Sequence, residues 1–142
     1  MRVVIVAEGK LKDRALRAAV DDYVTRVRRY ARCEELEVRD GNALARAIPK
    51  DSVLVALEVQ GDALSSRELA QRLEQWLSRG KGVVTFAIGG ANGLPAELSR
   101  TATARLSLSA MTLPHRLARL ILAEQIYRAF TILRGEPYAR ED

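Results

Sequence analysis

The sequence predicts an α/β fold in which helices flank a mostly parallel sheet. Short apolar runs rich in β-branched residues alternate with longer stretches whose apolar residues recur every three or four positions. The runs Arg2–Ala7, Val53–Val59 and Val83–Ile88 are apolar almost throughout, as in strands that a parallel sheet buries on both faces. With 142 residues and a hydrophobic content of 48%, the chain suits one domain, residues 1–142, around one core.

The first half of the chain supplies one helix and one edge strand. The stretch Asp13–Tyr30 predicts a helix, because its apolar residues form one stripe: Leu16, Val20, Tyr23, Val27 and Tyr30. Its arginines lie off that stripe, as on a solvated helix face, and an RNA-contacting face is the alternative. In Glu34–Arg39 apolar residues alternate with charged ones, which predicts an edge strand.

Two further helices precede the strand at Val83. A short helical piece around Ala43–Ile48 is closed by Pro49. Ser65 and Glu68 form a capping box, which predicts a helix start. The apolar residues that follow form one stripe, Leu69, Leu73, Trp76 and Leu77, and Gly80 ends the helix. Because Trp76 lies on this stripe, packing on the sheet is favoured over ligand stacking as its role.

Two strand-to-helix loops follow one another in the second half. Val83–Ile88 stops at Gly89 and Gly90, and a helix begins near Pro95. Ala104–Leu108 reads as another strand, followed by a loop of small and uncharged residues and a long helix from Pro114. Such loops converge at the carboxyl edge of a parallel sheet, where α/β folds bind ligands. The glycine spacing fits neither a dinucleotide fingerprint nor a Walker A loop, so either a tight turn or the close approach of an adenosine-like ligand explains it.

The last predicted helix runs from Pro114 to Arg134. Its apolar residues cover more than one side, which predicts a second covering surface and therefore a homodimer through this helix. His115, the only histidine, is either a helix-end packing residue or a substrate contact, and the helix dipole favours its neutral form. Glu124 and Arg128 are four residues apart and form either a surface pair or part of a site.

Composition narrows the function classes. The net charge is +5, and 19 of the 23 basic residues are arginine, which favours nucleic acid over a membrane surface as partner. One cysteine, Cys33, and one histidine argue against a disulfide framework and against a zinc site, so we expect no metal. No apolar run is long enough for a membrane span or a signal peptide, and we expect a cytoplasmic protein without membrane contact.

Six motifs in order along nearly the whole chain resemble the large-subunit ribosomal RNA pseudouridine N3-methyltransferase family of the SPOUT class. These motifs are Leu57–Gly61, Leu64–Ser66, Ile88–Leu94, Leu106–His115, Glu124–Phe130 and Arg134–Tyr138. The resemblance implies an S-adenosylmethionine-dependent enzyme, a homodimer, a 23S rRNA substrate on the assembled ribosome, and a deep trefoil knot near the C-terminus. A different RNA substrate such as tRNA, or a non-catalytic ribosome-associated protein, is the alternative.

The resemblance also implies site residues. It places the methyl donor against Leu57, Gly89, Gly90, Leu108, Ser109, Ala110, Met111, Thr112 and Leu113, and the RNA or the chemistry against His115, Arg128, Tyr138 and Arg140. The family usually ends in Tyr-His followed by Lys or Arg, whereas this chain reads Tyr138-Ala139-Arg140. A tail histidine is therefore missing, which shifts weight to Tyr138 and Arg140. We expect the two loops to line one cavity with this tail nearby.

Overall fold

The computed structural model describes residues 1–141, which form five strands, five α-helices and one 3₁₀ helix. In chain order the elements are β1 (Arg2–Glu8), α1 (Arg14–Val27), β2 (Arg32–Val38), α2 (Gly41–Ala47), β3 (Val53–Ala63), α3 (Ser66–Leu77), β4 (Val83–Ile88), α4 (Ala96–Thr101), β5 (Ala104–Ser107), α5 (His115–Leu133) and η1 (Pro137–Glu141).

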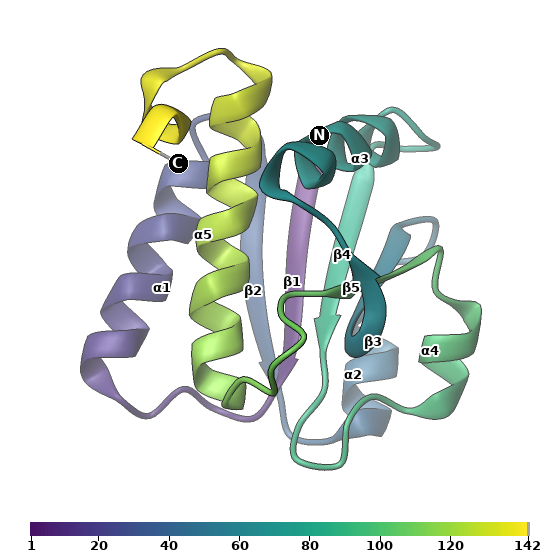
Figure 1. The fold of residues 1–142 in the computed structure, drawn as a ribbon. Helices are drawn as coiled ribbons and strands as arrows, with labels where there is room; N and C mark the ends of the chain where they lie inside the picture. The colour runs from purple at the N-terminus through teal and green to yellow at the C-terminus, as the bar shows by residue number, and fades with distance from the viewer. Residues whose placement is uncertain (142) are drawn as a thin grey trace.

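The five strands form one parallel sheet between two layers of helices (Figure 1). The strand order is β2-β1-β4-β3-β5, and every paired neighbour is parallel. Val3 and Ile5 of β1 belong to the core cluster that includes residues of α1, α3 and α5, whereas Val4 and Val6 belong to the cluster on the other face, with α2 and α4. The predicted α/β class is confirmed. The trefoil knot stays a prediction.

Local sequence signals define where the helices begin. Asp13 caps α1, since its Oδ1 accepts a hydrogen bond from the backbone N of Leu16 at 3.0 Å. The predicted capping box at α3 is present, with Ser65 N donating to Glu68 Oε1 at 2.9 Å and Glu68 N donating to Ser65 Oγ at 3.0 Å. Trp76 is 3% exposed and packs edge-on against a phenylalanine of β4, which confirms its core role.

Strand β3 differs from its prediction. Gln60 and Gly61, which follow the predicted strand Val53–Val59, are typical of a turn and predict that the strand ends there, but the strand continues to Ala63. Leu57 and Asp62 both pair with Leu106 of β5, so the residues between them bulge out of the ladder. A Cβ on Gly61 would lie 2.7 Å from the carbonyl carbon of Arg105, so only glycine lets β3 pass β5 this closely. The glycine that is typical of a turn therefore marks a bulge in β3 between Leu57 and Asp62.

Helix α5 packs between two other helices of the same chain. It contacts α1 on one side and α3 on the other, and Figure 1 shows it alongside α1. Tyr127 is 5% exposed and its ring contacts Tyr23 of α1, whereas Gln125 accepts a hydrogen bond from Ser66 of α3 at 2.7 Å. Part of the second covering surface that was expected from a partner subunit is thus provided within the chain, while Leu117 stays 38% exposed, and the homodimer stays a prediction.

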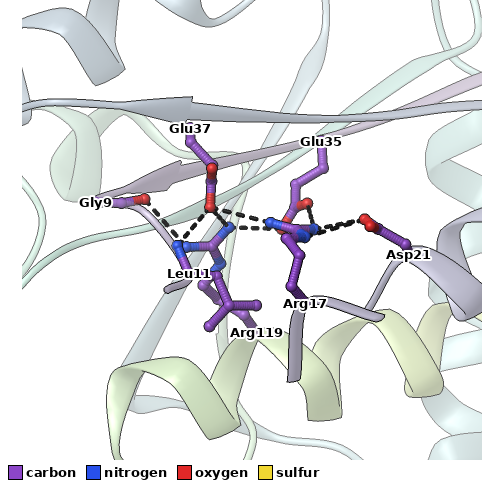
Figure 2. A network of polar contacts seen from close by, with 7 residues as sticks. All are labelled: Gly9, Leu11, Arg17, Asp21, Glu35, Glu37 and Arg119. Carbon is purple, nitrogen blue, oxygen red and sulfur yellow. Dashed lines mark hydrogen bonds and ion pairs between the residues drawn. The ribbon is translucent and has the colours of Figure 1, made fainter. Parts of the chain in front are cut away.

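A buried arginine ties α5 to the edge of the sheet (Figure 2). The side chain of Arg119 is 1% exposed, and its Nη2 donates to Glu35 Oε2 at 2.8 Å and also to Glu37, both on β2. Its Nη1 donates to the carbonyl oxygen of Gly9 at 3.1 Å. A guanidinium this deeply buried needs such partners, because a buried charge without them is costly.

The network extends to α1 through Arg17. Arg17 pairs with Glu35, with Glu37 at 3.1 Å and with Asp21 at 2.8 Å, so this arginine is not on the solvated face that was expected for it. Burial alone would raise the pKa of Glu37, but hydrogen bonds from Arg119 and from the backbone N of Leu11 outweigh it and hold the pKa below its ordinary value. The carboxylates of Glu35 and Glu37 on β2 therefore connect this strand to both α1 and α5.

Replacing Arg119 with leucine should destabilise the fold strongly. The change leaves Glu35, whose side chain is 8% exposed, without its buried partner, and we expect the free energy of unfolding to fall by about 3–5 kcal/mol. Urea denaturation followed by circular dichroism measures it. As a matched control, Arg100→Leu removes an exposed pair with Glu97 and should change stability little. Equal effects of the two substitutions would contradict the role assigned to the buried network.

Candidate active site

The loop after β4 is held by a close backbone contact. A Cβ on Gly89 would lie 2.4 Å from the carbonyl carbon of Gly93, so a larger residue cannot occupy this position. The loop closes as a tight turn, with Gly93 N donating to Gly90 O at 2.9 Å and Gly93 at φ 75°. The tight turn, one of the two interpretations of the glycines, is therefore confirmed, and the close approach of an adenosine-like ligand stays a prediction.

The loop after β5 carries hydroxyl groups and no charge. Ser107 Oγ donates to the carbonyl oxygen of Ser109 at 3.0 Å, and Ser109 Oγ accepts from the backbone N of Met111 at 2.9 Å. Pro114 then caps α5 with no side-chain hydrogen bond to the first turn. The loop thus delivers backbone groups, hydroxyls and the start of α5 to the same edge of the sheet.

These two loops and the end of β3 enclose a cavity of about 680 Å³. Its size lies within the range of about 300–1,000 Å³ that ligand pockets usually have. The wall combines the bulged segment of β3, both loops, one serine of α4 and the first turn of α5: Leu57, Glu58, Val59, Gln60, Ile88, Gly89, Gly90, Ala91, Gly93, Leu94, Ser99, Leu106, Leu108, Ser109, Met111, Thr112, Leu113, His115 and Ala118.

His115 contributes the imidazole at this cavity. The residue is half-buried, and its Nε2 is buried without a hydrogen-bond partner among the described residues. Burial and the nearby positive charge of Arg119 lower the pKa of His115 below the ordinary 6.5. A hydrogen bond with the backbone of Gly89 and the negative charge of Glu8 act in the opposite direction but do not outweigh them. The ring is therefore neutral at neutral pH, with one nitrogen available to accept a proton.

A second polar group lies farther along α5. Arg128 pairs with Glu124 at 2.9 Å and stands over the ring of Tyr138, 5.1 Å from its centroid. The hydroxyl of Tyr138 donates to Glu124 Oε2 at 2.7 Å. Burial, followed by this hydrogen bond, raises the pKa of Tyr138, so the phenol stays protonated at neutral pH. Glu124 and Arg128 are thus not a simple surface pair, because Tyr138 completes a three-residue contact.

This second group does not share the first cavity. Arg128 lines a separate hollow of about 410 Å³ with Ser66, Arg67, Gln125, Ile132 and Ala139. Arg128 lies thirteen positions after His115 on α5, which corresponds to about 20 Å along the helix axis. Arg140, in η1, is exposed. Within one chain, the tail expected near the cavity lies toward the opposite end of α5, as Figure 1 shows.

Similarity to known proteins agrees with this architecture. A family model described as predicted SPOUT methyltransferase matches residues 1–139. The chain belongs to the SPOUT methyltransferase family. A relative in Sorangium cellulosum named ribosomal RNA large subunit methyltransferase H is 56% identical, over 98% of this chain and 99% of that protein. A relative of the same name in Acetivibrio thermocellus is 41% identical, over 99% of this chain and 100% of that protein.

Solved structures add support for the SPOUT fold alone. A probable methylase family protein from Haemophilus influenzae superimposes with a TM-score of 0.56 at 12% identity, over 96% of this chain and 69% of that one. A structure described in connection with 2-OH methylation of C/U34 on tRNA gives a TM-score of 0.55 at 15% identity, over 95% of this chain and 98% of that one.

The structure gathers most of the residues proposed to hold the methyl donor. Eight of the nine line the cavity, and Ala110 is the exception. Sequence reasoning missed Val59 and Gln60 as wall residues, since the bulge that exposes them is invisible in the pattern of β3. It also missed Arg119, whose only sequence signal is a charge one turn after His115. In residues 1–141 we find no group of three or more potential ligands placed to hold a metal ion, and no helix long and apolar enough to cross a bilayer.

The ring of His115 should titrate below pH 6.5, because burial and Arg119 disfavour the imidazolium. The contribution of this pKa difference to the free energy of unfolding should be fully present above pH 6.5, the ordinary pKa of histidine. It should be lost as the pH falls through the lowered pKa of the folded state, since the unfolded chain binds the proton more readily. As the protein has one histidine, the NMR titration of its ring protons needs no assignment. The same titration in urea is the control, and a folded pKa at or above the unfolded value would refute this.

Alanine at Gly89 should be much more harmful than alanine at Gly90. At Gly89 the new methyl group meets backbone atoms of Gly93 and Leu94, whereas at Gly90 it meets only the flexible carboxylate end of Glu8. We expect Gly89→Ala to lower the melting temperature by several degrees and to disorder the loop, and Gly90→Ala to unfold close to wild type. Differential scanning calorimetry of both variants makes the comparison, and a reversed order would show that the loop is not fixed by this contact.

Proposed function

We propose that this chain is an S-adenosylmethionine-dependent methyltransferase that modifies N3 of a pseudouridine in 23S rRNA on the assembled ribosome. The observation that carries the proposal is end-to-end similarity to relatives named ribosomal RNA large subunit methyltransferase H, at 56% and 41% identity. The net charge of +5 suits an RNA partner. A ribosomal substrate places the protein in the cytoplasm, where ribosomes work.

Three observations support the cavity as the binding site of the methyl donor. It is large enough for a nucleoside, at about 680 Å³. The glycine turn at Gly89 removes side chains from its floor, and the loop Leu108–Leu113 presents backbone groups and hydroxyls that suit the edge of a purine ring. We assign Leu57, Gly89, Gly90 and the segment 108–113 to the donor. When bound there, the donor supplies an activated methyl group on sulfur.

The protein's residues must position the base and remove its proton. As N3 forms a bond to the methyl carbon, the carbon–sulfur bond breaks and N3 loses a proton. His115 is neutral and has an unpartnered nitrogen, so it can accept that proton. A guanidinium from Arg128 or Arg140 can stabilise the negative charge on the base as the proton leaves, and Tyr138 holds Arg128 in place through their ring contact.

A homodimer is part of the proposal, because one chain does not bring these groups together. His115 and Arg128 are about 20 Å apart along α5, too far to contact one base. Leu117 is 38% exposed at the start of α5, and Leu120 and Ile121 remain half-buried after α1 and α3 have packed. A second copy on this end of α5 would cover them and could carry its own Tyr138 and Arg140 to the cavity.

If the proposed function is correct, the protein binds S-adenosylmethionine and methylates ribosomes, and substitutions at the site residues lower the methylation rate. Calorimetry should detect S-adenosylmethionine at one site per chain. His115→Ala and Arg140→Ala should each lower the methylation rate of ribosomes by about 10²-fold or more. Arg79→Ala, which removes an exposed arginine far from the cavity, is the matched control and should stay near wild type. Full methylation by both site variants would overturn the assignment, and absence of donor binding would favour a non-catalytic ribosome-associated protein.

Sedimentation equilibrium should give twice the chain mass of 15.7 kDa at micromolar concentration. Leu117→Glu should weaken the dimer, since it places a charge on the exposed apolar start of α5. Ala45→Glu, which adds the same charge at an exposed position of α2 on the opposite face of the sheet, tests whether any added charge has the same effect. A stable wild-type monomer at that concentration would rule out the dimer and with it the shared site.

A further inference from the structure

One carboxylate stands on the wall of the cavity without a partner. Glu58, at the end of the regular part of β3, is half-buried and lines the cavity. Within residues 1–141 its side chain takes part in no hydrogen bond or ion pair. Other half-buried carboxylates of the chain, such as Glu35 and Glu124, are paired with arginines. An unpaired carboxylate inside a ligand cavity therefore needs an explanation.

The charge of Glu58 is not balanced by its surroundings. Of the described wall residues, none is lysine or arginine, and His115 is neutral at neutral pH. Glu58 is thus the single formal charge on the wall, in a chain whose net charge is +5. The cavity wall is therefore negative while the molecule as a whole is positive, as expected where a cation is bound.

A second carboxylate lies directly behind the glycine turn. Glu8 ends β1, and its Oε2 would come within 1.8 Å of a Cβ built on Gly90, so the carboxylate rests against the backbone of a wall residue. The side chain of Glu8 takes part in no ion pair or hydrogen bond in the described chain. Glu8 is not itself a wall residue, but it lies beside Gly90, and its charge also acts on His115, so its negative charge lies close to two residues of the wall.

We propose that Glu58, assisted by Glu8, makes the cavity select the positively charged methyl donor over the neutral product of the reaction. The inference rests on the proposed function. S-adenosylmethionine carries a sulfonium cation, and methyl transfer converts it to a neutral thioether while the rest of the molecule stays the same. The carboxylates attract the donor by a charge that the product lacks, so the reaction itself weakens binding and promotes exchange of product for fresh donor.

The size of the effect follows from the partly exposed setting. A unit charge pair several ångströms apart at a solvent-open site contributes enough for a preference of about fivefold from Glu58. Glu8, behind the backbone and farther from the cavity, should contribute about twofold in the same direction. Contacts to the adenosine, which donor and product share, do not enter this preference.

Isothermal titration calorimetry with three ligands tests the proposal. These are S-adenosylmethionine, S-adenosylhomocysteine, and sinefungin, in which an ammonium group replaces the sulfonium. Glu58→Gln should weaken binding of the two cationic ligands about fivefold and leave S-adenosylhomocysteine within twofold. Glu8→Gln should act in the same direction and less strongly. Glu58→Asp keeps the charge and should retain most of the preference.

The control and the contrary outcomes are distinct. Glu74→Gln removes the same charge from an exposed position of α3 and should change no affinity. Thermal unfolding verifies that each variant is folded. An equal loss for all three ligands in Glu58→Gln, or no change for any, would overturn the charge selection while leaving the methyltransferase function intact. If the wild type bound none of the three ligands, the proposed function would fail and this inference with it.

Discussion

The ion pairs of Arg119 connect the start of α5 to the edge of the sheet, and the position of the candidate active site depends on them. Arg119 lies one turn after His115, and its guanidinium is held by Glu35 and Glu37 of β2 and by the carbonyl of Gly9 after β1. Since a buried charge cannot move away from its partners without a large cost, the first turn of α5 has one stable position. That position puts His115 on the cavity wall, and the charge of Arg119 helps to keep its imidazole neutral.

The cavity itself follows from two backbone constraints at the carboxyl edge of a parallel sheet. The close contact of Gly89 with Gly93 folds the β4 loop back on itself, and the passage of Gly61 beside Arg105 forces the bulge in β3. Between them a space remains that side chains do not fill. Polar groups of the β5 loop and the carboxylate of Glu58 border that space, so it combines a nucleoside-sized volume with a negative wall.

The sequence predicted much of this and failed in understandable places. Parallel strands, the capping box at Ser65 and the two loops were all visible, because each depends on local pattern or on one residue type. The bulge at Gly61 was mistaken for a turn, since glycine marks both and only the partner strand decides. Arg119 looked like one more arginine of a basic helix, because its partners come from β2, more than 80 residues away in sequence. The separation of His115 from Tyr138 was also hidden, since motif order does not give distance in space. The knot and the pairing of two chains stay predictions for the same reason.

The central claim is that one chain architecture, repeated in a dimer, transfers a methyl group to N3 of a pseudouridine in 23S rRNA. Assembled ribosomes and tRNA from a strain lacking the protein, each incubated with the protein and labelled S-adenosylmethionine, give the most direct test when the labelled nucleoside is identified by mass spectrometry of nuclease digests. The account predicts label in one 23S rRNA nucleoside, a pseudouridine methylated on its base at N3, and none in tRNA. Label on a ribose, label confined to tRNA, or no incorporation into the ribosome would contradict it.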